Sequence, residues 1–319
     1  MRRLAIPFVA LVTVIGAALA MIGRIFLRRE KVDWRDAEIA GQVAEIDGVG
    51  IHYLDRGKGA AVILVHGFGG HTFSFRGITP ALSADYRVVA VDLIGFGYSE
   101  RPENADYSLT AQAQRVLALM DYLKIDRAAA IGHSMGGEVV MRMAAVAPDR
   151  IARLVLAGSV SGDRLPSLPV TPLIKPFLPA TVRLTGSLML SRTVYDPDFI
   201  TPEVREGYLA PKRVKGSMNA LYQILRDGRK DRRIDYSKIN QPTLVLWAAG
   251  ERIVPKIALN RIREHLPQAE VVTIQDAGHL LLEEQPEACL TAIREFFAAP
   301  APEALERETV TVDEAVVPA

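Results

Sequence analysis

A serine flanked by glycines is the first candidate for chemistry. The sequence Gly-His-Ser-Met-Gly at residues 132–136 fits the pattern G-x-S-x-G, between a run that predicts a strand and a segment that predicts a helix. A sharp strand-to-helix turn strains the backbone of its central residue, and small neighbours such as Gly132 and Gly136 tolerate this. The turn lifts the Ser134 hydroxyl into a cleft, at the positive end of the next helix. The pattern therefore predicts a nucleophilic serine.

A serine nucleophile needs a general base within reach of its hydroxyl. His279 ends the segment Asp-Ala-Gly-His at residues 276–279, just past the last predicted strand. A loop in this position lies over the carboxyl edge of the sheet, where the serine is also expected. Of the six histidines in the chain, His279 therefore has the best context for the base.

A carboxylate must orient the imidazole of this base and stabilise its charged form. Where an elbow of this type carries the serine, the chain order is Ser, then Asp or Glu, then His. Glu251 follows a predicted strand between the two residues and is our choice for the acid. Asp163 is the alternative, whereas Asp276 is too close to His279 along the chain.

A glycine-rich loop supplies the remaining part of the predicted site. The sequence His-Gly-Phe-Gly-Gly at residues 66–70 directly follows an apolar run. Small residues leave backbone N–H groups free to point into a cleft, and a tetrahedral oxyanion needs two such donors. The N–H groups of Phe68 and Met135 are the expected pair. We expect His66 to hold this loop by hydrogen bonds.

The body of the chain alternates between two kinds of pattern. Short continuous apolar runs predict strands buried on both faces of a parallel sheet, at residues 62–65, 88–91, 128–131, 154–156, 243–247 and 271–274. Helical spacing lies between them, at residues 111–123 (with Thr110 as the expected N-cap), 138–147 and 287–297. Asp47-Gly48 predicts a hairpin that opens the sheet. This alternation predicts an α/β fold, a mostly parallel twisted sheet flanked by helices.

The alternation breaks once, which divides the chain. Residues 40–161 and 238–299 form the expected core. Residues 162–237 are rich in proline at their start and then predict helices, so we interpret them as a helical cap inserted over the carboxyl edge of the sheet. Residues 300–319 hold several acids and prolines and predict a disordered tail.

Residues 1–30 are a separate region of the sequence. The uncharged run from Leu4 to Ile22 is long enough as a helix to cross a bilayer core of about 30 Å, and basic residues flank it on both sides. We therefore expect a single-pass N-terminal anchor, a membrane localisation and the membrane as a partner. The alternatives are a cleaved signal peptide with a secreted or periplasmic product, and a terminal helix that packs on the protein.

The composition excludes several classes of function. Of the 319 residues, 49% are hydrophobic and 24% are charged, which is typical of a globular chain and excludes global disorder. The net charge of +1 gives no reason to expect nucleic acid as a partner. The single cysteine, Cys289, excludes an intrachain disulfide and a cysteine-based zinc site. We make no prediction of an oligomeric state.

The chain resembles the α/β-hydrolase superfamily, and it is similar to the bacterial lipase and esterase branch that also includes meta-cleavage-product hydrolases. The resemblance runs from about residue 43 to 297 and rests on four segments in the family's order, at residues 66–70, 92–99, 132–137 and 276–279. It implies Ser134 as nucleophile, His279 as base, and an oxyanion hole at Phe68 and Met135. The family usually has Asp where this chain has Glu251.

These features predict a membrane-anchored serine hydrolase that cleaves small-molecule or lipid carboxylic esters through an acyl-enzyme, as an esterase or lipase. No metal or organic cofactor is implied. A serine at the elbow excludes the epoxide hydrolase and haloalkane dehalogenase modes, which the resemblance assigns to Asp there. The alternatives are a carbon-carbon bond hydrolase or an acyltransferase that uses the same three residues. Outside enzymology, the alternative is a catalytically silent hydrolase fold used for binding.

Overall fold

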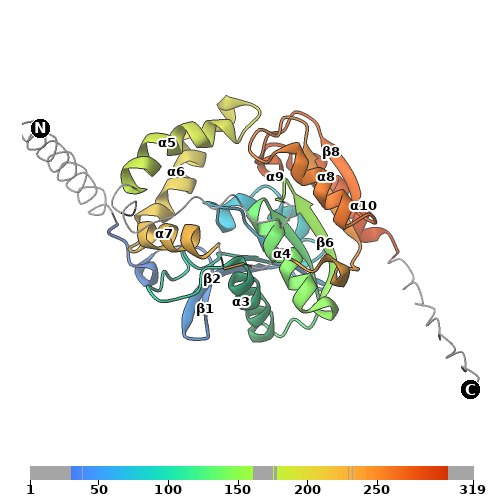
Figure 1. The fold of residues 1–319 in the computed structure, drawn as a ribbon, viewed down its shortest axis with the longest axis horizontal. Helices are drawn as coiled ribbons and strands as arrows, with labels where there is room; N and C mark the ends of the chain where they lie inside the picture. Colours follow the sequence, from blue (N-terminus) through green and yellow to red (C-terminus); the bar gives the residue numbers. More distant parts are fainter. Residues whose placement is uncertain are drawn as a thin grey trace, which may run out of the picture.

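One twisted sheet organises the computed structural model, which describes residues 30–37, 39–160, 175, 178–228, 230–231 and 233–300. Among these residues the sheet has eight strands in the order β1-β2-β4-β3-β5-β6-β7-β8 (Figure 1). The β1–β2 and β2–β4 pairs are antiparallel and all other pairs are parallel. The strands are β1 (Gln42–Ile46), β2 (Val49–Arg56), β3 (Ala61–Val65), β4 (Arg87–Val91), β5 (Ala128–His133), β6 (Ile151–Ala157), β7 (Thr243–Ala248) and β8 (Glu270–Ile274).

The six apolar runs that predicted strands all lie in this sheet, as β3 to β8. Successive side chains point to opposite faces, so each run supplies both layers of core. In β3, for example, Val62 and Leu64 belong to one cluster of buried side chains, and Ile63 and Val65 belong to the other. The predicted mostly parallel α/β sheet is therefore confirmed.

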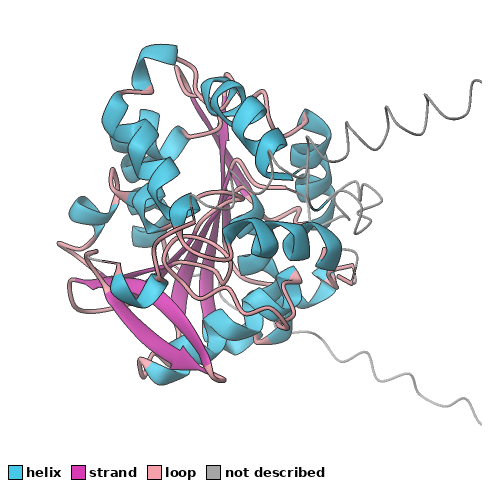
Figure 2. Ribbon diagram, turned by 90° about the vertical axis from the view of Figure 1, so that its left-hand side faces the viewer, coloured by secondary structure: helices cyan, strands magenta, loops and turns pink. Residues whose placement is uncertain are grey.

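Helices cover both faces of the sheet (Figure 2). The Ile63 side packs on α3 (Leu109–Tyr122), α4 (Met135–Val146) and α8 (Lys256–His265). The Val62 side packs on α2 (Thr79–Leu82), α9 (Leu281–Glu284) and α10 (Pro286–Ala298). Cys289, on α10, is fully buried in this second layer.

The predicted hairpin is present as β1 and β2. Asp47 and Gly48 join the strands with φ values of 50° and 75°, which match a two-residue turn of type I′. Ile46 and Val49 are paired directly across the turn. This hairpin places its two antiparallel strands at one edge of the sheet.

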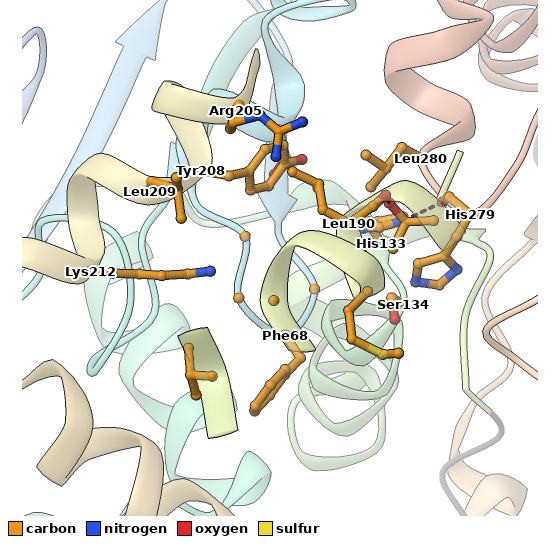
Figure 3. Close-up of a pocket in the computed structure, with 18 of the residues that line it drawn as sticks. Phe68, His133, Ser134, Leu190, Arg205, Tyr208, Leu209, Lys212, His279 and Leu280 are labelled. Atoms are coloured by element: carbon orange, nitrogen blue, oxygen red, sulfur yellow. Dashed lines mark hydrogen bonds between the residues drawn. The ribbon is translucent and has the colours of Figure 1, made fainter. Parts of the chain in front are cut away.

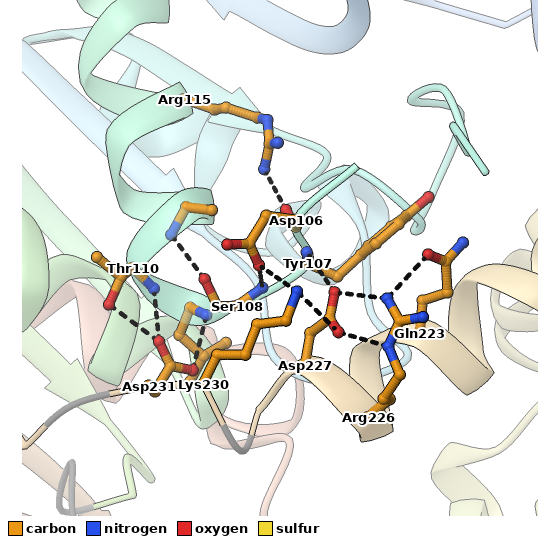
Figure 4. Close-up of polar contacts among 12 residues, drawn as sticks. Asp106, Tyr107, Ser108, Thr110, Arg115, Gln223, Arg226, Asp227, Lys230 and Asp231 are labelled. Carbon is orange, nitrogen blue, oxygen red and sulfur yellow. Dashed lines mark hydrogen bonds and ion pairs between the residues drawn. The ribbon is translucent and has the colours of Figure 1, made fainter. Parts of the chain in front are cut away.

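The N-terminus of α3 differs from the prediction, because Ser108 is the N-cap and Thr110 is not. The Ser108 hydroxyl accepts the N–H of Ala111 at 3.2 Å. The Asp231 carboxylate, from the segment after α7 (Ser217–Asp227), accepts the N–H of Leu109 at 2.9 Å and that of Thr110 at 3.0 Å (Figure 4). A negative charge at the positive end of a helix is stabilising, so this contact fastens the segment after α7 to the core.

In the described part of the chain, three α-helices follow β6 and precede β7 in sequence, where a cap is predicted (Figure 1). They are α5 (Leu178–Arg192), α6 (Pro202–Leu209) and α7. The division into a core at 40–161 and 238–299 and a cap at 162–237 stays a prediction, and this arrangement supports it. Asp163 and the tail residues 301–319 lie outside the described residues.

The predicted membrane localisation is wrong by this structure. A span requires about 20 apolar residues in one helix, and no helix in the described ranges is long and apolar enough to cross a bilayer. The run from Leu4 to Ile22, on which the prediction rested, lies outside the described residues. The first described residues contact the predicted cap, through a bridge between Val32 and Val214.

Candidate active site

The predicted elbow is present at the junction of β5 and α4. Ser134 has φ 52° and ψ −118°, a strained conformation for a residue with a side chain, and α4 begins at the next residue. The Ser134 N–H donates to the carbonyl of Ala157 on β6 at 2.9 Å. A Cβ atom at Gly136 would lie 2.1 Å from the carbonyl oxygen of Val65, so only glycine fits there. Close packing against neighbouring strands thus holds the strained turn.

The structure brings His279 and Glu251 together. The Nδ1–H of His279 donates to Oε2 of Glu251 at 2.8 Å, and the two side chains are 7% and 2% exposed. The other carboxylate oxygen accepts the N–H groups of Ile253 at 2.7 Å and Val254 at 3.0 Å. Burial by itself would raise the pKa of Glu251, but these hydrogen bonds outweigh it and hold the pKa below its ordinary value. The carboxylate is therefore ionised and fixes the imidazole with Nε2 as its free acceptor.

Ser134 and His279 line one cavity of about 540 Å³. Figure 3 shows the imidazole ring of His279 beside the Ser134 side chain. Loops that follow β3, β5 and β8 form one wall, and residues of α5 to α7 and the turn after α6 form much of the other. The carboxyl edge of the sheet and the predicted cap therefore enclose the site together.

The loop after β3 presents its backbone to the serine. A Cβ atom at Gly67 would lie 2.9 Å from the Cβ of Ser134, so the loop approaches the elbow closely. Among the described residues, the N–H groups of Phe68 and Met135 donate to no backbone carbonyl in a turn, a loop or a helix cap. Met135 is the first residue of α4, where an N–H has no partner within the helix. Both predicted oxyanion donors thus have free N–H groups beside Ser134.

The α/β hydrolase fold family matches residues 60–286. The chain belongs to this family. An uncharacterised hydrolase of Bacillus subtilis, YugF, is 30% identical over 262 residues, which are 79% of this chain and 95% of the relative. Lipase 3 of Moraxella sp. is 32% identical over 233 residues, 71% of this chain and 73% of the lipase.

A solved α/β hydrolase also resembles the chain. The structure of 2-hydroxy-6-oxo-6-phenylhexa-2,4-dienoate hydrolase from Rhodococcus sp. matches with a TM-score of 0.69 and 28% identity. The match covers 82% of this chain and 99% of the other. The named similar proteins therefore include a lipase and a hydrolase of a dienoate, which act on different kinds of substrate.

Two buried histidines support the site of this α/β hydrolase through hydrogen bonds. Burial lowers the pKa of His66 to about 4 and that of His133 to about 3, so both rings are neutral near pH 7. His66 accepts the N–H of Leu93 at 3.0 Å and donates to the carbonyl of Gly67 at 2.7 Å, which confirms the expected role in holding the loop. His133 donates to the carbonyl of His279 at 2.7 Å and so positions the base. The sequence had given His133 no such role.

The turn at residues 92–99 is structural, as the family resemblance implies. The buried Asp92 carboxylate accepts the Nδ1–H of His52 at 2.8 Å and the N–H groups of Thr72 at 2.6 Å and Tyr98 at 2.8 Å. Burial opposes ionisation, but the hydrogen bond and the charge of His52 outweigh it and hold the pKa of Asp92 far below its ordinary value. Among the described residues, no group of three or more His, Cys, Asp or Glu side chains is arranged to hold a metal ion.

A buried polar network, missed in the sequence, joins the predicted cap to the core. The hydroxyl of Tyr208, on α6, lies 3.1 Å from the Ser74 hydroxyl and donates to the carboxyl group of Glu283, on α9. Arg76 pairs with the other oxygen of Glu283. Burial raises the pKa of Glu283 to about 7, although Arg76 opposes the rise. Tyr208 and Ser74 line the cavity, so the network forms part of its wall.

We expect Glu283 to make the free energy of unfolding fall as the pH rises towards 7. Its pKa is 4.5 in an ordinary setting and about 7 here, so the folded protein binds an extra proton between these values. Stability is greatest below the ordinary pKa, and above pH 7 the loss levels off at about 3 kcal/mol. Urea unfolding of Glu283→Gln at pH 5 and pH 8 should show a smaller pH dependence than wild type. The exposed Glu287→Gln is the control, and equal dependences in wild type and Glu283→Gln would contradict the assignment.

Proposed function

We propose that this α/β hydrolase is a serine hydrolase that cleaves carboxylic esters. The observation that carries the proposal is a strained serine elbow that opens into the same cavity as a buried His279–Glu251 pair. Nucleophilic catalysis explains both the strained backbone of Ser134 and the fixed imidazole of His279, because the first exposes the nucleophile and the second orients its base. The lipase among the relatives supports the same reaction.

In the proposed reaction, Ser134 attacks the ester carbonyl while Nε2 of His279 takes the hydroxyl proton. The N–H groups of Phe68 and Met135 stabilise the tetrahedral oxyanion. His279 then gives its proton to the departing alcohol, which leaves an acyl group on Ser134. Water activated by His279 hydrolyses this acyl-enzyme and restores the serine. Glu251 keeps the imidazole in the correct tautomer and stabilises its charged form throughout.

The cavity favours a substrate with a hydrocarbon part. Its volume of about 540 Å³ is in the range of small-molecule sites. Apolar side chains from both the core and the predicted cap line it, among them Phe68, Val182, Leu190, Leu209 and Leu280. These side chains would remove an acyl chain from water, which contributes about 0.8 kcal/mol per buried methylene group.

Hydrolysis of p-nitrophenyl esters from acetate to palmitate tests the proposal. We expect release of p-nitrophenol, with a preferred chain length set by the cavity, and labelling of the protein by a fluorophosphonate probe. A preference for short chains would indicate an esterase, and one for long chains a lipase. Folded protein that neither cleaves an ester nor takes up the probe would overturn the proposal and favour a binding role.

Carbon-carbon bond hydrolysis is the second candidate, because a dienoate hydrolase is among the similar solved structures. That reaction would use the same serine, base and oxyanion hole on a vinylogous diketone. Cleavage of such a diketone, with no simple ester accepted, would replace the first proposal. Acyl transfer to an alcohol in preference to water would instead indicate an acyltransferase.

A further inference from the structure

Lys212 presents a positive charge to the cavity that holds Ser134. The residue belongs to the short 3-10 helix Ala210–Arg213, which follows α6. Figure 3 shows its side chain extended into the cavity, across from His279. Lys212 and Ser134 both line this cavity, so a molecule bound at the serine also meets the ammonium group.

The described residues around this ammonium group leave it without an ion-pair partner. Burial lowers the pKa of Lys212, with no acidic neighbour to oppose the change. Among the residues that the structure describes, no carboxylate lies within ion-pair distance of its Nζ atom. The neighbouring Arg213 pairs with Glu206, at 2.5 Å. The carboxylate of Glu30, which also lines the cavity, accepts two backbone N–H groups at the start of α7, at 2.9 and 2.8 Å.

Lys212 is half-buried, and a cation that is partly withdrawn from water without a partner is disfavoured. An anion of a bound molecule would offset that cost. We propose that the substrate is an ester with an oxyanion, a carboxylate or a phosphate, at the end remote from the scissile carbonyl, and that Lys212 binds it. This inference rests on the ester hydrolase function proposed above and specifies its substrate class. The Lys212 ammonium group is a compact point charge with three rotatable donors, so a carboxylate and a phosphate both fit it.

The apolar lining defines what joins the two ends of this substrate. Leu190, Leu209 and Leu280 line the cavity together with Lys212 and Ser134. Hydrocarbon is therefore expected between the ester carbonyl at Ser134 and the oxyanion at Lys212. An acyl chain that ends in an anionic group meets both requirements.

Two esters that differ by one charge test the proposal. The mono-p-nitrophenyl ester of suberic acid carries a free carboxylate, and its methyl-blocked analogue has the same chain without the charge. We expect wild type to have the higher kcat/KM on the anionic ester. Lys212→Met should lower the ratio of the two kcat/KM values about tenfold or more, since a hydrogen bond to a charged group is lost. Lys212→Arg should keep most of the ratio, and it guards against an effect of misfolding.

Lys215→Met is the matched control, because Lys215 is exposed and lies 3.9 Å from Asp33. It should keep the wild-type ratio. A wild-type ratio of one or less, or an unchanged ratio in Lys212→Met, would overturn the anion site. If the methyl-blocked ester is cleaved in that case, the proposed esterase function stands.

Binding gives an answer that does not depend on turnover. Calorimetry with Ser134→Ala compares octanoate, octyl phosphate and octanol, with and without Lys212→Met. We expect the anions to bind more tightly than octanol, and the second substitution to weaken them about tenfold. The tighter of the two anions identifies carboxylate or phosphate as the source of the charge. Equal binding of anions and octanol would overturn the proposal even if no ester is cleaved.

Discussion

Ser134→Ala is expected to lower kcat for p-nitrophenyl esters by about 10⁵- to 10⁶-fold. The substitution removes only the hydroxyl group, so the elbow, the oxyanion donors and the cavity stay in place. Residual hydrolysis would come from the oxyanion hole and from binding alone. Labelling by a fluorophosphonate should vanish together with activity, because both reactions need the same oxygen atom. Stopped assays at high protein concentration can measure the remaining rate.

The control for this prediction is Ser237→Ala, which removes an exposed hydroxyl that donates to Asp235 at 2.6 Å. It should keep wild-type kcat and probe labelling. A Ser134→Ala protein that folds and still retains more than about a hundredth of wild-type kcat would contradict nucleophilic catalysis by this serine. The activity would then have to arise from another residue or from water activated by His279.

The sheet was predictable because each strand carries its own signal. A continuous apolar run fits a strand that is covered on both faces, and β3 to β7 are covered in this way. The hairpin was predictable because Asp47-Gly48 takes the positive φ values that its turn requires. The N-cap of α3 was less predictable, since Ser108 and Thr110 are both suitable residues. The choice between them depends on Asp231, which arrives from a distant part of the chain.

The predicted site residues come together because short segments of the chain fix each of them. The elbow around Ser134 and the loop around Phe68 are set by glycines that are local in sequence. No local sequence pattern marks Lys212, Tyr208 or Glu283. Lys212 and Tyr208 reach the cavity, and Tyr208 reaches Glu283 in its wall, only because α6 packs on the core. The predicted membrane anchor rested on the composition of residues 4–22 alone, and these residues lie outside the part of the chain that the structure describes.

Glu251→Gln is expected to lower kcat by about 10³- to 10⁴-fold, the second largest effect that we predict. The amide has nearly the same shape, but it carries no charge to stabilise the imidazolium of His279, and its NH₂ group can favour the wrong tautomer. Glu251→Asp tests reach as well as charge, because the shorter side chain withdraws the carboxylate by about 1.5 Å. The present contact of 2.8 Å to Nδ1 would be lost unless the loop moves. We therefore expect an intermediate kcat for Asp, although the family usually has Asp here.

A positioning role for Glu251 has a consequence that a merely structural role lacks. If Glu251 acts only through His279, then Glu251→Gln should cost almost nothing in a protein that already carries His279→Ala. Additive losses in the double variant would mean that the carboxylate acts on something other than the imidazole. Glu264→Gln, an exposed carboxylate on α8, controls for the general effect of losing one negative charge. A Glu251→Gln protein with wild-type kcat would direct the search to Asp163, the other carboxylate that the chain order allows.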